Sequence, residues 1–190
     1  FFFFCLNKVV IKEKLRSKIL KLRKNYSNNS IKLNPTKIYA YFKQNNYKFK
    51  TIGGYYPSNH EIDDLEILSY FVKRGSSISL PIIKKNSKMD FYKWSNEIPL
   101  EINKYGIPEP ISEKKLFPDI LFVPLVGYDY KLNRLGYGGG YYDRYIDKML
   151  RIKKTIKIGL AFSYQKLKKI PINKYDKKLD IIITEKEFIT

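Results

Sequence analysis

Apolar residues recur along the chain with two different spacings, one typical of helices and one typical of buried strands. Leu15, Ile19 and Leu22 stand among lysines and arginines at helical intervals, which predicts an amphipathic helix with a basic outer face. Asn34 precedes a proline that suits the first position of a second helix. Gly75 is a suitable residue to end a third helix. Helices are therefore predicted over 9–24, from Pro35 onward, over 63–74 and over 141–151.

Short apolar runs rich in β-branched residues separate these helices and predict strands. They cover 51–56, 77–83, 119–126, 155–162 and 179–184, with a further short strand at 89–94. The rest of the stretch 84–117 is rich in proline and is predicted to be irregular. Strands that alternate with helices favour an α/β fold, a three-layer α-β-α arrangement of Rossmann-like type with a mainly parallel sheet.

The length and the cysteine content favour one domain in a reducing compartment. A chain of 190 residues can bury a core without disulfides or a structural metal. Cys5 is the only cysteine, which rules out an internal disulfide and favours a cytoplasmic location. The apolar run 1–6 is too short for a transmembrane helix. We interpret 1–7 as a terminal extension and 8–190 as a single domain; the alternative for 1–7 is docking on a partner.

The formal net charge of +19 is typical of proteins that bind polyanions. The lysines, however, are spread along the whole chain, and runs such as 166–169 are ordinary on a solvated surface. No helix-turn-helix pattern, zinc finger or RNP aromatic pair accompanies them. Nucleic acid is therefore not an expected partner, and a basic nucleic-acid-binding module remains the alternative from another class of protein.

Four glycines fall within the five positions 136–140, between a predicted strand and a predicted helix. Glycine permits positive φ and close approach of amide groups to an anion, and a helix N-terminus strengthens such a phosphate site. The segment is neither a Walker A loop nor the dinucleotide-binding fingerprint. Arg134, Tyr141, Tyr142 and Asp143 flank it with a phosphate-pairing cation, aromatic rings and a candidate magnesium ligand. The alternative is a flexible hairpin.

The segment 119–124, followed by Gly127-Tyr128-Asp129 and by 133–143, resembles the signature of 5-formyltetrahydrofolate cyclo-ligases, also called methenyltetrahydrofolate synthetases. The likeness extends from about Lys12 to Thr184. Other parts of the family pattern occur in the same order along the chain, at Lys12-x-x-Leu15-Arg16, Tyr56-Pro57, 61–63, Leu80-Pro81, 89–91, 106–110, 171–173 and 176–180.

This resemblance implies an enzyme that converts 5-formyltetrahydrofolate and ATP to 5,10-methenyltetrahydrofolate, ADP and phosphate with Mg²⁺. ATP would phosphorylate the formyl oxygen, after which the second folate nitrogen closes the ring and phosphate leaves. In such a reaction the protein mainly positions the reactants and neutralises charge. The implied partners are a reduced folate and ATP, without nucleic acid or membrane. The expected assembly is a monomer, with a dimer as the alternative.

The resemblance also implies roles for individual residues. Arg134 and Asp143 are the expected catalytic residues, and Asp143 and Asp180 are the expected metal ligands. The ATP-binding set adds Lys12, Glu13, Lys14, Leu15, Arg16, Leu135, Gly136, Tyr137, Gly138, Gly139, Gly140, Tyr141 and Tyr142. The folate is expected to contact Tyr56, Glu61, Tyr137, Gly138, Gly139, Gly140 and Tyr141.

Several of these residues have an ordinary structural alternative. Lys12 and Arg16 suit a solvated basic helix, Glu61 suits the dipole of the helix after it, and Asp180 suits a strand edge. His60 is the only histidine, and we assign it no catalytic role.

Two segments of the chain depart from the family pattern. Tyr137 and Gly139 stand where the typical loop often carries a basic residue, which leaves phosphate neutralisation to the cations named above. Tyr175 precedes Asp176 where many relatives carry histidine. The alternative among enzymes is another phosphate-handling protein of similar architecture.

Overall fold

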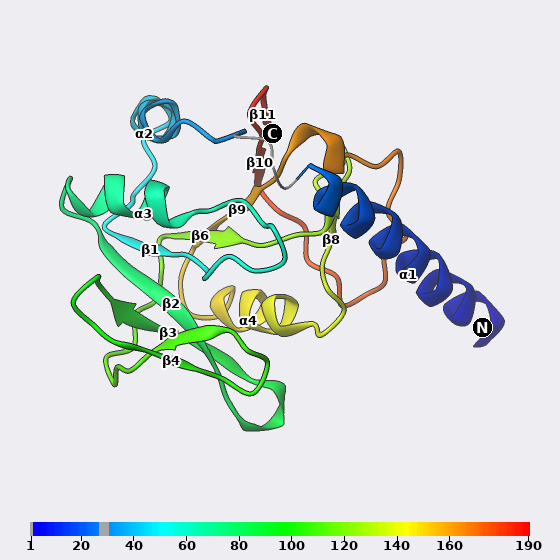
Figure 1. Cartoon of the computed structure of the whole chain (residues 1–190), viewed down its shortest axis with the longest axis horizontal. Helices are drawn as coiled ribbons and strands as arrows, with labels where there is room; N and C mark the ends of the chain where they lie inside the picture. The colour runs from blue at the N-terminus through cyan, green and yellow to red at the C-terminus, as the bar shows by residue number, and fades with distance from the viewer. Residues whose placement is uncertain (1, 27–30) are drawn as a thin grey trace.

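The computed structural model describes residues 2–26 and 31–190, and a seven-stranded sheet lies at its centre (Figure 1). The five inner strands run parallel, whereas the two edge strands, β3 and β11, run antiparallel to their neighbours. The predicted mainly parallel α/β fold is thereby confirmed. In spatial order the strands are β11 (Phe188–Ile189), β10 (Ile181–Ile183), β9 (Ile156–Leu160), β6 (Ile120–Val123), β1 (Thr51–Gly53), β2 (Ser77–Ile83) and β3 (Met89–Trp94).

Helices cover both faces of this sheet, which completes the predicted three layers. Helices α2 (Pro35–Gln44) and α3 (Leu65–Val72) lie on one face and α4 (Tyr141–Met149) lies on the other (Figure 1). Alternate residues of a strand point to opposite faces. In β6, Phe122 accordingly packs in the α2–α3 core and Leu121 packs in the α4 core.

Helix α1 (Phe2–Asn25) begins within the expected terminal extension, whose first residue lies outside the described part of the chain. The basic outer face predicted for this helix does not include all of its basic residues. Ile19 is buried as expected, but Arg23 is also buried, at 2% exposure. The Arg23 guanidinium donates hydrogen bonds to the Tyr137 hydroxyl and the Leu125 carbonyl, which compensate the loss of water around a charge.

The helix boundaries predicted from capping residues agree with the structure. Asn34 accepts hydrogen bonds from the amides of Thr36 and Lys37, as an N-cap does at the start of α2. Gly75 follows α3 with a φ of +89°, the left-handed conformation that glycine adopts readily after a helix.

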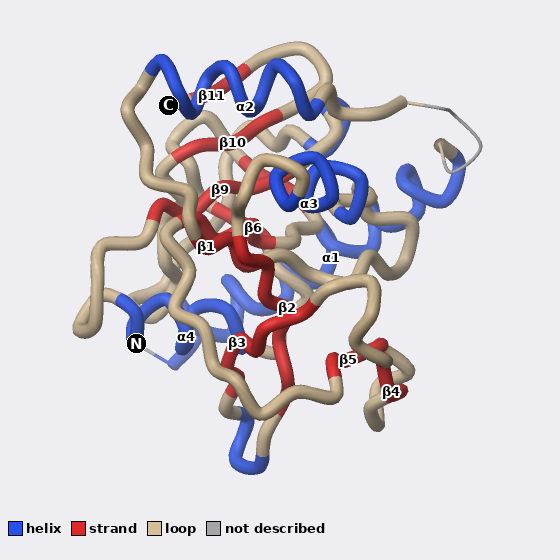
Figure 2. Tube along the Cα trace, turned by 90° about the vertical axis from the view of Figure 1, so that its left-hand side faces the viewer, coloured by secondary structure: helices blue, strands red, loops and turns tan. Residues whose placement is uncertain are grey.

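The stretch 84–117 contains more regular structure than predicted. Besides the 3-10 turn η1 (Lys85–Ser87), strands β4 (Leu100–Ile102) and β5 (Pro108–Pro110) form a hairpin that stands beside the main sheet (Figure 2). Buried Glu109 anchors this hairpin, because its side chain accepts hydrogen bonds from the backbone amide of Ile83 at 2.8 Å and from the Asn103 amide at 2.7 Å.

A second small hairpin leads into the glycine-rich segment. It consists of β7 (Gly127–Tyr128) and β8 (Arg134–Leu135), and a 3-10 turn, η2 (Ser163–Gln165), follows β9.

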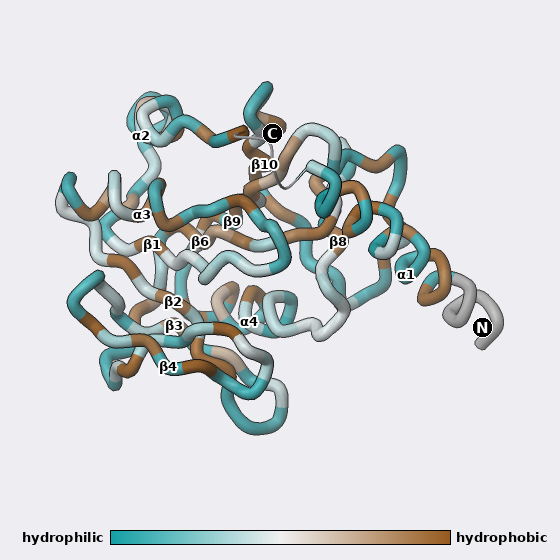
Figure 3. The backbone as a smooth tube through the Cα atoms, viewed as in Figure 1, coloured by the Kyte–Doolittle hydropathy of each residue, from teal (hydrophilic) through white to brown (hydrophobic). Residues whose placement is uncertain are grey.

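Figure 3 shows the apolar residues gathered along the central strands β6 and β9. Within the described residues, no helix has the length and apolar character needed to span a membrane.

Candidate active site

A cleft of about 1430 Å³ lies where the inner parallel strands end, the usual place for ligands in such sheets. The cleft brings together segments that are far apart in the sequence. Residues that line it come from α1 (Lys12, Glu13, Arg16), from the loop after β1 (Tyr56, Glu61), from the β4–β5 hairpin (Tyr105, Ile107), from the glycine-rich segment 134–143 and from the loop 173–177.

The glycine-rich loop has the positive φ angles that its glycines permit. Gly138 and Gly140 have φ values of +107° and +66°, and α4 starts immediately afterwards. Arg16 donates from Nε to the Gly136 carbonyl at 2.7 Å. A side chain added at Gly138 would meet the Arg16 guanidinium at 3.5 Å. The loop therefore lies against a cation of α1, at a helix N-terminus that favours anions.

Arg134 and Asp143 form an ion pair within this loop. Arg134 Nη2 donates to Asp143 Oδ2 at 2.8 Å, and the two side chains are 6% and 19% exposed. Asp143 Oδ1 accepts a hydrogen bond from the backbone amide of Lys177 at 3.0 Å. Arg134 Nε is buried and has no hydrogen-bond partner among the described residues. The guanidinium thus keeps a donor for a further acceptor.

Lys12 points into the same cleft from α1. Its Nζ forms an ion pair of 2.6 Å with Asp176, and the Lys12 side chain is only 12% exposed. Because both partners line the cleft, the alternative of a freely solvated lysine at this position is wrong. Asp176 also accepts a hydrogen bond from the Asn173 amide, which ties the loop 173–177 to α1.

Glu61 presents a carboxylate to the cleft from the loop between β1 and α3. Its Oε2 accepts hydrogen bonds from the Ser58 amide at 2.9 Å and the Ser58 hydroxyl at 3.2 Å. Its Oε1 is buried without a hydrogen-bond partner among the described residues. Burial raises the pKa of Glu61, and the Ser58 hydrogen bonds, the nearby Tyr137 hydroxyl and the charge of Arg23 oppose the shift. Tyr56 lines the cleft beside it.

Asp64 is fully buried next to this loop and was not predicted. Its Oδ2 accepts a hydrogen bond from the Tyr55 amide at 2.9 Å, while its Oδ1 has no partner among the described residues. Burial raises the pKa of Asp64 well above its ordinary value. The Tyr142 hydroxyl is also buried and unpartnered in the described structure, and burial together with the charges of Asp64 and Glu61 raises the pKa of Tyr142.

The β4–β5 hairpin supplies residues that the sequence did not indicate. The hydroxyls of Tyr105 and Tyr141 lie 2.8 Å apart, so the hairpin and the glycine-rich loop are joined by a hydrogen bond. Ile107 and Asn103 also line the cleft. The hairpin could not be recognised from the pattern of apolar residues, because its strands are only three residues long and one begins and ends with proline.

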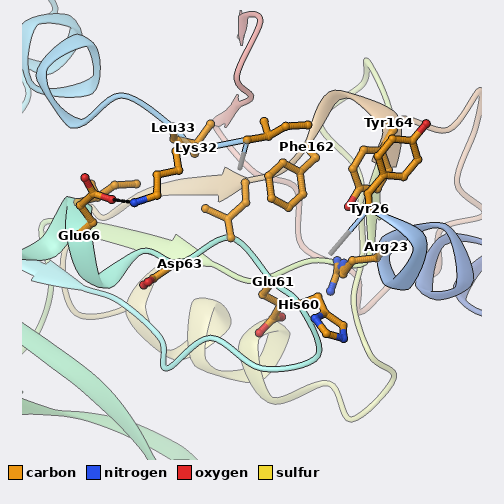
Figure 4. A pocket seen from close by; sticks show the side chains of 13 residues that line it. Arg23, Tyr26, Lys32, Leu33, His60, Glu61, Asp63, Glu66, Phe162 and Tyr164 are labelled. Carbon is orange, nitrogen blue, oxygen red and sulfur yellow. Dashed lines mark hydrogen bonds and ion pairs between the residues drawn. The ribbon is translucent and has the colours of Figure 1, made fainter. Parts of the chain in front are cut away.

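A second, smaller cavity of about 210 Å³ adjoins the first, and Glu61 lines both. Figure 4 shows Arg23 directed from the end of α1 toward Glu61 and His60. The rings of Tyr26 and Tyr164 also line this cavity and stack with centroids 4.7 Å apart (Figure 4).

A family model described as 5-formyltetrahydrofolate cyclo-ligase family matches residues 8–185. The chain belongs to this family. It is therefore an enzyme of the ligase class, as the resemblance implied. A 5-formyltetrahydrofolate cyclo-ligase of Haemophilus influenzae is 32% identical over 142 residues, covering 70% of this chain and 75% of that one. The enzyme of the same name from Escherichia coli is 28% identical over 141 residues, covering 70% and 77%.

Solved structures support the same assignment. A 5,10-methenyltetrahydrofolate synthetase from Aquifex aeolicus superposes with a TM-score of 0.74 and 28% identity, covering 94% of this chain and 91% of that one. A synthetase of the same name from Mycoplasma pneumoniae, with a TM-score of 0.69, 24% identity and coverage of 90% and 97%, shares the fold. The fold of the cyclo-ligase family thus covers nearly the whole chain.

Not every residue expected from the family pattern lies in the cleft. Leu15 packs in a small core with Ile19 and Leu135, and Lys14 is exposed outside the cleft lining, because they lie on other sides of α1 than Lys12 and Arg16. Leu15 and Lys14 are therefore not placed to contact a ligand by their side chains.

Asp180 lies just before β10, at the amino end of the parallel strands and outside the cleft lining. Its carboxylate accepts a hydrogen bond from the Lys157 amide at 2.8 Å and pairs with Lys157 Nζ at 3.0 Å. Asp180 thus lies at a strand edge, as the structural alternative had it, and not beside Asp143 as a second metal ligand. Among the described residues, no group of three or more His, Cys, Asp or Glu side chains could hold a metal ion.

Proposed function

We propose that this enzyme converts 5-formyltetrahydrofolate to 5,10-methenyltetrahydrofolate at the expense of ATP, through a phosphorylated formyl intermediate. The proposal rests on the residues that line one cleft. The glycine-rich loop with its cations occupies one part of it, and the Glu61 carboxylate with Tyr56 occupies another. A phosphate-binding part and a part suited to a ring rich in N–H groups thus open into the same space.

The nucleotide phosphates would lie at the glycine-rich loop. Three cations, Lys12, Arg16 and Arg134, line the cleft around its backbone, and α4 points its N-terminus at the loop. Neutralisation of the phosphoryl charge by fixed cations and amides is the main source of catalysis in phosphoryl transfer. Arg134 suits this role best, because Asp143 fixes its orientation and its Nε remains unpaired within the described structure.

The folate would lie with its pterin ring toward Glu61. A carboxylate can accept hydrogen bonds from the amino and ring N–H groups of a pterin, because its two oxygens together accept more than the two bonds that Ser58 donates, and Glu61 lines the cleft. Tyr56 and the segment 137–141 would border the ring and the formyl group.

The proposed reaction has two steps that balance. The formyl oxygen attacks the γ-phosphorus of ATP, the bond to the bridging oxygen breaks, and ADP leaves. The second folate nitrogen then attacks the activated formyl carbon and loses its proton to water, and the carbon–oxygen bond breaks as the oxygen departs with phosphate. The role of the residues in the cleft is to hold the two reactants in line and to stabilise charge on the transferred group.

Mg²⁺ fits the site through Asp143. Mg²⁺ is commonly held by one or two carboxylates, with substrate phosphates and water completing its coordination. Asp143 lies at the end of the glycine-rich loop and is 19% exposed, so its carboxylate faces the region proposed for the phosphates. Bound there, the cation would neutralise charge on the phosphates.

The placement of the cations favours small-molecule partners over nucleic acid. Lys12, Arg16 and Arg134 point into the cleft, and Arg23 points into the protein interior rather than onto a basic outer surface. We also propose that the enzyme acts in the cytoplasm as a monomer, on the basis of its single cysteine and of a cleft built within one chain.

Turnover tests the proposed function. Purified enzyme with 5-formyltetrahydrofolate, ATP and Mg²⁺ is expected to form the near-ultraviolet chromophore of the methenyl product, with one ADP per product. Hydrolysis of ATP without the chromophore, or no reaction by folded protein, would refute it.

A further inference from the structure

Three residues from separate elements meet at the wall between the two cavities. Glu61 lines both cavities, Tyr137 lines the large cleft, and Arg23 lines the small one. They come from the loop after β1, the glycine-rich loop and α1, so this point joins the proposed folate and nucleotide parts of the site.

Arg23 is a buried cation with fixed partners. It is 2% exposed, and its Nη1 donates to the Tyr137 hydroxyl oxygen at 2.6 Å while its Nη2 donates to the Leu125 carbonyl at 2.5 Å. A buried charge needs such partners, and removal of one leaves the charge uncompensated. Arg23 therefore fixes the position of the Tyr137 hydroxyl.

The Tyr137 hydroxyl has one proton to donate and already accepts from Arg23. Its proton is consequently directed away from the cation. Glu61 Oε1 is an acceptor on the same wall, buried and without a hydrogen-bond partner among the described residues. Burial and the negative charge of Glu61 both raise the pKa of Tyr137, and the charge of Arg23 opposes this rise. The Tyr137 hydroxyl therefore interacts electrostatically with both side chains.

We propose that Tyr137 is a positioning residue, whose hydroxyl is held by Arg23 and donates its proton to Glu61, so that occupation of the glycine-rich loop strengthens folate binding. This inference rests on the proposed function, since Glu61 is the group that would bind the pterin ring. Arg23 holds only the hydroxyl end of Tyr137, whereas nucleotide on the loop would also hold its backbone, next to Gly138. By linkage, folate must strengthen nucleotide binding by the same factor.

A further consequence concerns pH. A hydrogen bond to a carboxylate favours its charged form, so loss of the Tyr137 hydroxyl disfavours ionised Glu61. The titratable and charged groups that interact with Glu61 from its own loop and from the packed elements are Arg23, Tyr55, Asp64, Tyr137 and Tyr142. His60 and Asp63 line the same small cavity. The substitution Tyr137→Phe changes only one of these groups, because it removes the hydroxyl that lies between Arg23 and Glu61.

Calorimetric titration of Tyr137→Phe tests the inference. The affinity for folate is measured twice, once without nucleotide and once with a non-hydrolysable ATP analogue plus Mg²⁺. The coupling is the affinity with the analogue divided by the affinity without it. The parent is expected to show a ratio of about five or more, the lower end of ordinary coupling between sites. In the variant the ratio should fall to about one. The loss of folate affinity on acidification should also begin at a higher pH in the variant.

Two further variants complete the experiment. Tyr130→Phe is the matched control, since Tyr130 is exposed outside the cleft and its hydroxyl accepts from Lys166. Its coupling and pH profile should equal those of the parent. Arg23→Lys keeps the charge but not the two-pronged guanidinium, so it should weaken the coupling less than Tyr137→Phe.

Retention of the parent ratio and pH profile by Tyr137→Phe would overturn the positioning role alone, as would an equal loss for both ligands with the pH profile unchanged. A parent ratio near one would overturn the coupling itself. If instead the parent binds no folate, the proposed function fails and this inference fails with it.

Discussion

Replacement of Asp143 by asparagine removes one negative charge beside Arg134 while it keeps the size of the side chain. In the parent, Asp143 Oδ2 accepts from Arg134 at 2.8 Å and Oδ1 accepts from the Lys177 amide at 3.0 Å. Asparagine retains one acceptor oxygen, so one of the two bonds is lost or becomes a neutral contact. Since Arg134 is only 6% exposed, water cannot fully replace the lost partner.

The structure sets the size of the effect on stability. Loss of a hydrogen bond to a charged group costs about 1.5–3 kcal/mol. For a chain of this length each kcal/mol lowers Tm by about 2–4 °C, which gives a decrease of about 3–12 °C. If the carboxylate also holds Mg²⁺ on the phosphates, kcat should fall by about two to three orders of magnitude. The Mg²⁺ concentration for half-maximal rate should rise as well.

Urea unfolding of the ligand-free protein and Mg²⁺ titration of the rate measure the two effects separately. Asp147→Asn is the matched control, because Asp147 is 41% exposed, lies one turn further along α4 and pairs with Lys177 and Arg151. Such exposed pairs contribute about 1 kcal/mol or less. Parent-like stability of Asp143→Asn would refute the anchoring of Arg134, and a parent-like Mg²⁺ dependence would refute the metal role.

Three further changes test other parts of the site. Gly138→Val forces a β-branched residue to a φ of +107°, so calorimetry should show nucleotide binding weakened far more than folate binding; unchanged nucleotide affinity would reduce the loop to a turn. Glu61→Gln should weaken folate binding by about 1.5–3 kcal/mol with little effect on ATP alone, and equal losses for both ligands would indicate a structural role instead. Burial holds the pKa of Asp64 well above its ordinary value of 3.8, so the folded state retains a proton that the unfolded chain releases, and this group lowers stability as pH rises above that value. In Asp64→Asn the free energy of unfolding measured with urea should decline less as the pH rises above the ordinary value of 3.8, whereas an identical decline would contradict this account.

The fold was largely predictable because its determinants are local. The apolar runs at 77–83 and 89–94 gave strands with the observed bounds, and Asn34 and Gly75 marked helix ends through their own backbone preferences. The β4–β5 hairpin was missed, since its anchoring depends on the buried side chain of Glu109 and not on a run of apolar residues.

The candidate site was predictable only where a motif carried it. The sequence placed the glycine-rich loop, but it did not indicate that Arg23 is buried, because an arginine on a basic helix ordinarily faces water. Tyr105 lines the cleft, and Asp64 is buried beside the Glu61 loop, through tertiary contacts alone. Asp180 was misplaced for the same reason, since its position at the amino end of β10 depends on the direction of the strand in the sheet.

Transfer of isotopic oxygen tests the central claim most directly. The enzyme is given 5-formyltetrahydrofolate labelled with oxygen-18 in the formyl group, together with unlabelled ATP and Mg²⁺, and the released phosphate is analysed by mass spectrometry. A phosphorylated formyl intermediate predicts that each phosphate carries the formyl oxygen, in an amount equal to the methenyl product. Unlabelled phosphate, or label that stays in the folate while ADP accumulates, would contradict the account.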